Sequence, residues 1–150
     1  MIDPEEKEFE VAASILEDCR RYIAAHKIQR WDVVKWGVSV NLILAVAAAT
    51  PALAEVRYYL LLLSCGVAAA SWLLVRHYNQ RMTGTRKQAE TTVSWLMKKG
   101  IDYDAILGES TKAAYASREN YDHQELRLFA WILGVSPVLV LLTLIFLPAK

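Results

Sequence analysis

The chain has 150 residues, of which 17 are Lys or Arg and 16 are Asp or Glu, so its formal net charge is only +1. Its mean hydropathy of +0.20 and its 22% of charged residues would suit a soluble protein. That average is misleading, because three long runs carry no acid or base while the rest of the chain is densely charged. The distribution excludes an ordinary soluble protein.

The three uncharged runs are Trp36–Ala54, Tyr58–Val75 and Phe129–Leu147, of 19, 18 and 19 residues. At ~1.5 Å per residue each gives a helix of about 27 to 29 Å, close to the ~30 Å of bilayer hydrocarbon. In hydrocarbon the backbone must satisfy its own hydrogen bonds, which helices do. We therefore predict an all-α, three-transmembrane-helix integral membrane protein with a small helical cytoplasmic domain.

Basic residues concentrate in two segments, with six between Lys7 and Lys35 and nine between Arg76 and Arg127. The positive-inside rule places both segments in the cytoplasm, so we predict a multi-pass protein of the bacterial inner membrane, N-terminus cytoplasmic and C-terminus periplasmic. The predicted parts are a cytoplasmic amphipathic helix at 1–30, a transmembrane hairpin at 31–76 (helices at about 33–54 and 57–76), a cytoplasmic helical segment at 77–127 and a third transmembrane helix at 128–147.

The cytoplasmic segments carry helix signals of their own. Thr85 with Gln88 predicts a new helix after Gly84, ended by Gly100, and Asp122 with Glu125 predicts a cap before the third span. The first segment has an apolar stripe at helical spacing, which we expect to pack on the second segment, the alternative being a membrane-surface anchor. The stripe comprises Phe9, Ala12, Leu16, Cys19 and Ile23, widened by Val11, Ile15 and Tyr22.

Small residues recur every fourth position in the first span, at Gly37, Asn41, Ala45 and Ala49. Small side chains let membrane helices approach closely, so this stripe predicts a helix interface, either within one chain or between subunits. The amide of Asn41 needs a polar partner in hydrocarbon and is interpreted as a link between helices or as a pore-lining group. Val140 in the third run is taken as a lipid-facing position.

A basic cluster follows the second span, with a single acid, Glu90, among six cations. Such a cluster next to a membrane attracts anionic lipid headgroups, each charge contributing about 1 kcal/mol. Simple positive-inside anchoring is the plainer interpretation, and an RNA or other phosphate ligand is disfavoured because no nucleic-acid motif accompanies the charge. The cluster comprises Arg76, Arg81, Arg86, Lys87, Lys98 and Lys99.

One catalytic pattern is present. Arg118 and His123 form an RxxxxH sequence, as do Arg21 and His26, and this spacing resembles the active-site motif of HEPN ribonucleases. Chance predicts about half a match in a chain of this composition, so the pattern is weak. We expect no enzyme activity, no cofactor and no metal site.

Three stretches carry a family resemblance: Arg30–Ala45 (RWDVVKWGVSVNLILA), Gly100–Leu107 (GIDYDAIL) and Tyr121–Pro137 (YDHQELRLFAWILGVSP). They resemble small bacterial RipA-like octameric membrane proteins, a family that includes the membrane accessory protein of type VI CRISPR systems. The resemblance implies a ring-like homo-oligomer in the inner membrane with a cytoplasmic helical vestibule, and it raises the option of a pore used in antiphage defence. Some members also carry a HEPN-like motif.

These observations predict a homo-oligomeric inner-membrane pore or membrane effector, with further copies of itself and membrane lipids, anionic ones included, as partners. One alternative is a non-conducting scaffold that recruits a cytoplasmic protein through residues 1–30 and 77–127; another is a membrane-tethered HEPN-like ribonuclease. Nucleic acid is disfavoured as a partner. The polar side chains considered as a pore lining are Ser39, Asn41, Ser64 and Ser71, which form no strongly polar stripe.

The charge distribution makes the topology testable. A reporter enzyme fused after Lys150 should be active in the periplasm, and the same reporter fused near Gly108 should be active in the cytoplasm, because 15 of the 17 basic residues would then lie inside. The reverse pattern of activities would contradict the assigned orientation.

Overall fold

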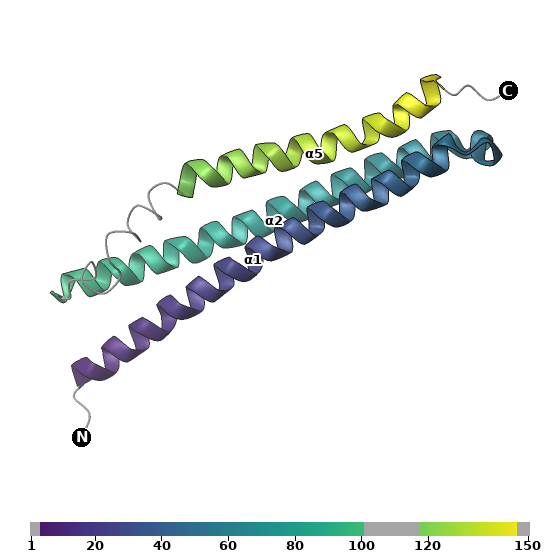
Figure 1. The fold of residues 1–150 in the computed structure, drawn as a ribbon. Helices are drawn as coiled ribbons and strands as arrows, with labels where there is room; N and C mark the ends of the chain where they lie inside the picture. The colour runs from purple at the N-terminus through teal and green to yellow at the C-terminus, as the bar shows by residue number, and fades with distance from the viewer. Residues whose placement is uncertain (1–3, 101–117, 147–150) are drawn as a thin grey trace. The chain divides into compact units, whose positions relative to one another are not determined.

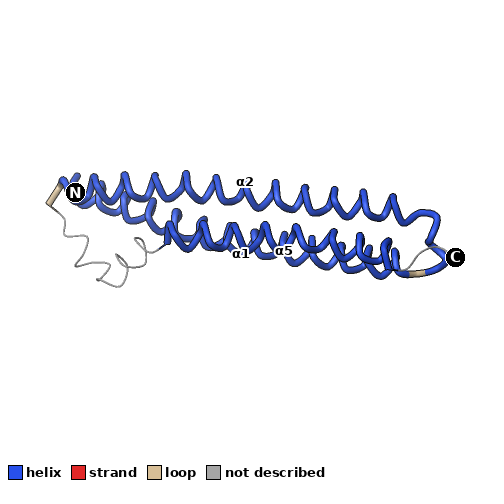
Figure 2. The backbone as a smooth tube through the Cα atoms, turned by 90° about the horizontal axis from the view of Figure 1, so that it is seen from above, coloured by secondary structure: helices blue, strands red, loops and turns tan. Residues whose placement is uncertain are grey.

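The computed structural model describes residues 4–100 and 118–146. Within these ranges the chain forms three α-helices, α1 (Pro4–Ala49), α2 (Arg57–Lys98) and α5 (Arg118–Phe146) (Figure 1). A short 3₁₀ helix, η1 (Pro51–Val56), joins α1 to α2. Figure 2 shows helices and short connections and no strand among the described residues, so the all-α prediction is confirmed there.

Three helices are long and apolar enough to span a membrane, at Lys7–Ala49, Pro51–Lys98 and Gln124–Thr143. With 46 and 42 residues, α1 and α2 are about twice the length that bilayer hydrocarbon requires, ~20 residues. Each of them therefore has an apolar half and a charged half. Residues 101–117 and 147–150 lie outside the described residues, and with them most of the GIDYDAIL stretch.

The predicted helix start at Thr85 is wrong, because α2 runs through Gly84 without interruption. The Thr85 hydroxyl donates to the carbonyl of Arg81 at 3.1 Å, which is the way a threonine hydroxyl is satisfied inside a helix and not at a cap. The predicted end at Gly100 is confirmed. α2 ends at Lys98, and Gly100 has a φ of +79°, a left-handed conformation that glycine adopts without strain.

The chain divides into two compact units, and the first contains Met1–Ile28 and Tyr78–Asp122. Its described core, called here the helical pair, is α1 up to Ile28 against α2 from Tyr78. The helices run antiparallel: Lys99 pairs with Glu8 at 3.0 Å at one end, and the Tyr78 and His26 rings lie 5.5 Å apart at the other. The apolar stripe of the first segment therefore packs on α2.

A heptad-like spacing explains this contact. On each helix of the pair one series of buried or half-buried residues is separated alternately by three and four positions, which is the repeat of a coiled-coil seam. Phe9 at the free end remains 37% exposed. On α1 the seam comprises Ala12, Leu16, Cys19, Ile23 and His26, and on α2 it comprises Tyr78, Met82, Thr85, Ala89, Thr92 and Leu96.

The second unit contains Gln29–His77 and His123–Lys150, and its described part, called here the bundle, joins α1, α2 and α5. One apolar cluster brings together Val34, Val75, Phe129 and Leu133. A second cluster contains Leu44, Ala48 and Val140.

The assignment of Val140 to the lipid-facing surface is wrong, because Val140 is fully buried in the bundle. It continues the buried series Phe129, Leu133 and Ser136, whose spacings of four, three and four residues define one face of α5. A helix that is apolar all round gives no hydropathy contrast between its inner and outer faces.

At Gly37 the helices of the bundle approach one another closely. A Cβ placed on it would lie 2.5 Å from Ser71 Oγ, 3.1 Å from Ser71 Cβ and 3.1 Å from Leu133 Cδ2. The first distance can be relieved by rotating the Ser71 hydroxyl, but the other two involve atoms held by packing. Gly37 thus allows α1, α2 and α5 to meet.

Replacing Gly37 with Leu should force the three helices apart and lower the free energy of unfolding by about 1 to 3 kcal/mol or more. Thermal unfolding in detergent, followed by circular dichroism, measures the effect. Gly66→Leu and Gly134→Leu are matched controls, because no atom lies within 4 Å of a Cβ at either position. Equal midpoints for all three variants would contradict the close approach.

Candidate functional site

A buried chain of hydrogen bonds crosses the bundle and links its three helices. Ser64 Oγ on α2 donates to Asn41 Oδ1 on α1 at 2.7 Å, and Asn41 Nδ2 donates to Ser136 Oγ on α5 at 2.9 Å. The Ser136 hydroxyl then donates to the carbonyl of Leu133 at 2.9 Å. All three polar side chains are at most 3% exposed. The structure thus places Asn41 between helices of one chain.

Pro137 explains why this series of hydrogen bonds ends at the Leu133 carbonyl. Proline has no backbone N–H, so the carbonyl four residues earlier, that of Leu133, loses its usual helical partner. In an apolar surrounding an unpaired carbonyl is costly, and serine side chains are one means of satisfying it. The hydroxyl of Ser136 takes the place of the missing N–H and still offers a lone pair to Asn41.

The direction of these bonds leaves little freedom. Each serine hydroxyl has a single proton, and in both residues that proton is committed to one acceptor. The two bonds between helices contribute about 1 to 3 kcal/mol together, since interhelical hydrogen bonds in membrane proteins average ~0.6 and reach ~1.7 kcal/mol. Their larger effect is on register, because sliding one helix by a residue would strand the Asn41 amide among apolar side chains.

A buried ion pair lies in the same bundle. Arg30 Nη2 on α1 contacts Glu125 Oε2 on α5 at 2.7 Å, and the Arg30 side chain is fully buried. The guanidinium also lies 5.8 Å from the centre of the Phe129 ring, which meets the Trp31 ring edge to face. A buried pair costs desolvation on both sides, so its main consequence is specificity: losing one partner leaves an uncompensated charge, typically ~3 to 5 kcal/mol.

The ion pair between Arg30 and Glu125 corrects the predictions made for each of these residues. Glu125 was expected in a helix cap with Asp122, which is wrong, because both residues lie inside α5. Arg30 was counted only as a positive-inside charge. Arg30 lies on the buried face of α1, four residues after His26 and four before Val34. A charged residue at a position of this buried series is the feature of the sequence that could have indicated a buried ion pair.

The small-residue stripe of the first span faces the chain's own bundle. Gly37 and Asn41 are buried, while Ala45 and Ala49 are half-buried, with Ala45 packed against the Leu44 cluster. Of the other polar residues considered as a pore lining, Ser64 and Ser71 are buried and Ser39 is exposed. Ser136 was overlooked in the sequence, although its position immediately before Pro137 marks a side chain able to replace the lost N–H.

The basic residues predicted to bind lipid or phosphate are spread along α2 and do not converge. From Arg76 to Lys98 the axial distance is about 33 Å at ~1.5 Å per residue. With a Debye length of ~8 Å, only cations near Arg76 and Arg81 would feel a headgroup layer at Arg76. Lys99 already pairs with Glu8. The remaining members are Arg86, half-buried, and Lys87 and Lys98, exposed.

The catalytic candidates Arg118 and His123 both belong to α5, but their side chains lie outside the described part of the chain. Among described residues no three His, Cys, Asp or Glu side chains are grouped as metal ligands. Cys19 is buried in the helical pair, and burial, aided by the negative charge of Asp18, raises the pKa of its thiol. At neutral pH Cys19 therefore has even less thiolate than an ordinary cysteine and is a poor nucleophile.

Replacing Asn41 with Leu should remove both bonds between helices and lower the free energy of unfolding by about 1 to 3 kcal/mol. Equilibrium unfolding in mixed detergent micelles gives the value. Ser39→Leu is the control, since Ser39 is a polar residue of the same helix that is exposed. If both substitutions change stability equally, the hydrogen-bonded chain does not hold the bundle.

Comparison with known proteins adds no relative. No protein-family model, no curated protein and no solved structure matches the sequence. The resemblance to RipA-like membrane proteins therefore stays a prediction from the three quoted stretches. The chemistry of the chain's own residues remains the basis for any functional proposal.

Proposed function

We propose that the chain is a membrane scaffold of the bacterial inner membrane, with its N-terminus in the cytoplasm and its C-terminus in the periplasm. In this proposal the bundle is a non-conducting anchor, and the helical pair is the part that engages other proteins. The observation that carries the proposal is the inward hydrogen bonding of Asn41, Ser64 and Ser136.

A water-filled pore needs polar groups that face its lumen. In the bundle Asn41, Ser64 and Ser136 instead bind one another. Within the uncharged part of α1, residues 36–49, the exposed positions are apolar except Ser39. An apolar outer face with internally matched polar groups is what a lipid-embedded anchor requires. Large exposed apolar side chains of this face include Leu42, Ile43, Val46, Leu62, Leu63 and Leu73.

The helical pair differs from the bundle in the surrounding expected for its exposed apolar side chains. It belongs to the charged halves of α1 and α2, for which water is the expected surrounding, yet it exposes large apolar side chains. Ile28 is 63% exposed and Met97 is 55% exposed. Apolar surface of this kind on a water-facing part supports a protein-binding role.

Reconstituted vesicles test the non-conducting anchor. Full-length protein in vesicles of mixed zwitterionic and anionic lipid, loaded with a self-quenching dye, should release dye no faster than empty vesicles. Added gramicidin, with proton flux read by a pH-sensitive dye, shows that the vesicles are sealed. Release above background that disappears in Ser39→Leu would contradict the proposal and favour the pore, with Ser39 lining it.

The binding half of the proposal has its own test. A photo-crosslinking residue at Met97 should give a discrete protein adduct in intact cells, because Met97 is exposed and apolar, whereas the same residue at the exposed polar position Glu10 should not. Equal labelling at both positions would count against a defined binding surface.

A further inference from the structure

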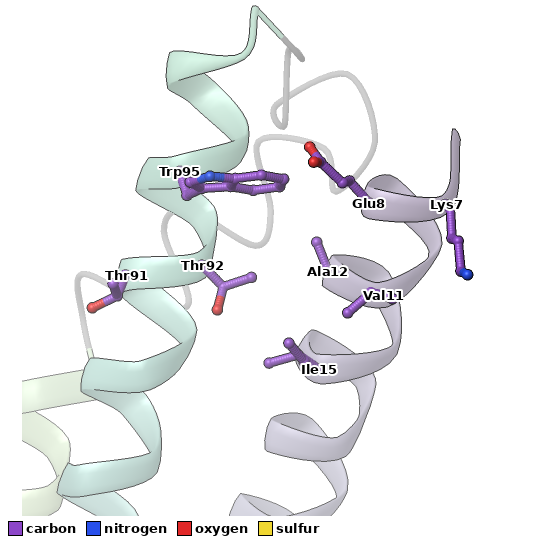
Figure 3. A pocket seen from close by; sticks show the side chains of 8 residues that line it. All are labelled: Lys7, Glu8, Val11, Ala12, Ile15, Thr91, Thr92 and Trp95. Carbon is purple, nitrogen blue, oxygen red and sulfur yellow. The ribbon is translucent and has the colours of Figure 1, made fainter. Parts of the chain in front are cut away.

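A groove, apolar in its larger part, runs along one side of the helical pair. Its larger part is a cavity of about 670 Å³, and a second cavity of about 230 Å³ continues it, with Ile15 lining both. In Figure 3 Trp95 and Thr92 on α2 point across the gap toward Ala12 and Ile15 on α1, while Lys7 points away.

The groove is as long as a short helix. Its lining extends along α1 from Lys7 to Tyr22, which is about 22 Å at ~1.5 Å per residue. Ala12, a small residue of the seam that lines the larger cavity, leaves this space open. The nearby hydroxyls are already used, because Thr91 and Thr92 donate to the carbonyls of Lys87 and Gln88 at 2.8 and 3.0 Å. The wall of the larger cavity is therefore suited to an apolar occupant, whereas Asp18, Thr85 and Gln88 make the smaller cavity partly polar.

The apolar stripe of α1 is wider than a two-helix contact needs. A strict coiled-coil seam uses two positions per heptad, whereas a helix in a bundle of three or more uses a third. On α1 the additional positions are Val11, Ile15 and Tyr22, and all three line the groove. This pattern indicates that helices other than α1 and α2 complete the core.

The charges of the pair indicate which helices these are. Residues 4–18 of α1 contain six acids and one base, and residues 86–99 at the same level of α2 contain four bases and one acid. If two pairs meet groove to groove around a two-fold axis parallel to the helices, each acidic α1 lies between two basic α2 helices. The like-charged helices then face each other only across the diagonal. The charge distribution of the helical pair is thus complementary to that of a second copy.

We propose that a second copy of the chain occupies this groove, its own groove facing the first, so that two helical pairs form a four-helix bundle. Anchoring in one membrane supports this arrangement, because copies inserted in the same orientation can be related by a two-fold axis along the membrane normal. The axis keeps equivalent residues at one height and brings Ile15 of the two copies near each other. The inference rests on the proposed topology and goes beyond the scaffold role, which a single copy could fulfil.

Crosslinking in native membranes tests the pairing. In the full chain carrying Cys19→Ser and Cys65→Ser, Ile15→Cys should give a covalent dimer with a bis-maleimide spanning about 10 Å, the order of a helix-to-helix spacing. Ala13→Cys is the matched control, because Ala13 is exposed on the same helix and lines neither cavity. No dimer from Ile15→Cys, or an adduct with a different protein in its place, would overturn the proposal.

Particle mass provides a second readout that does not depend on cysteine. Val11→Asp should reduce the mass of the detergent-solubilised particle about twofold, because it places a carboxylate between helices in the groove, while Ala13→Asp should leave the mass unchanged. Val11 is 54% exposed, so the isolated chain tolerates the change, and circular dichroism checks that helix content is kept. A wild-type particle of one chain, or of an odd number of chains, would overturn the pairing. Dye release without loss of pairing would instead contradict only the scaffold.

Discussion

The hydrogen-bonded chain from Ser64 through Asn41 and Ser136 to the Leu133 carbonyl determines how the bundle is arranged. All three helices exchange directional contacts there, whereas the apolar clusters on either side would tolerate a small slip. Once the position of Asn41 is fixed, the positions of the residues one and two turns away on α1 are fixed as well. Gly37 is positioned against Ser71 on one side, and Ala48 is positioned in its cluster with Val140 on the other.

The spacing of alternate three and four residues continues along α2 from the helical pair into the bundle, whereas on α1 His26, Arg30 and Val34 are four residues apart. The physical basis of the contact also changes between the two parts. In the charged halves the seam gains from removing apolar surface from water. In hydrocarbon, the surrounding that we propose for the bundle, that gain is absent, and close packing with a few polar bonds must replace it. The composition changes accordingly, from Leu16 and Ile23 in one half to Gly37, Asn41 and Ser71 in the other.

The sequence was sufficient for the helices and the apolar spans, because charge-free length and helical spacing are local properties. It failed where a local signal was outweighed by the rest of the helix, as at Thr85, whose cap-like pattern lies inside α2. The prediction also failed where every face of a helix is apolar. The inner and outer faces of α5 do not differ in hydropathy, so the sequence did not indicate that Val140 is buried. The pairing of Arg30 with Glu125 joins residues 95 positions apart, and only the packed bundle brings them together. Asn41 could be recognised as a link between helices, but its partners on α2 and α5 could not be identified from spacing alone.

Pro137 and the three polar side chains form a set whose members depend on one another. Ser136 is needed because Pro137 deprives Leu133 of a donor, and the hydroxyl that donates to the Leu133 carbonyl also accepts from the Asn41 amide. Effects of substitutions within such a set do not add, because the first change already removes part of what the second would remove. A lineage that replaced Pro137 by a residue with a backbone N–H would give the Leu133 carbonyl its usual helical donor and leave the Ser136 hydroxyl proton without its present acceptor. The four positions are therefore expected to change in evolution as a group.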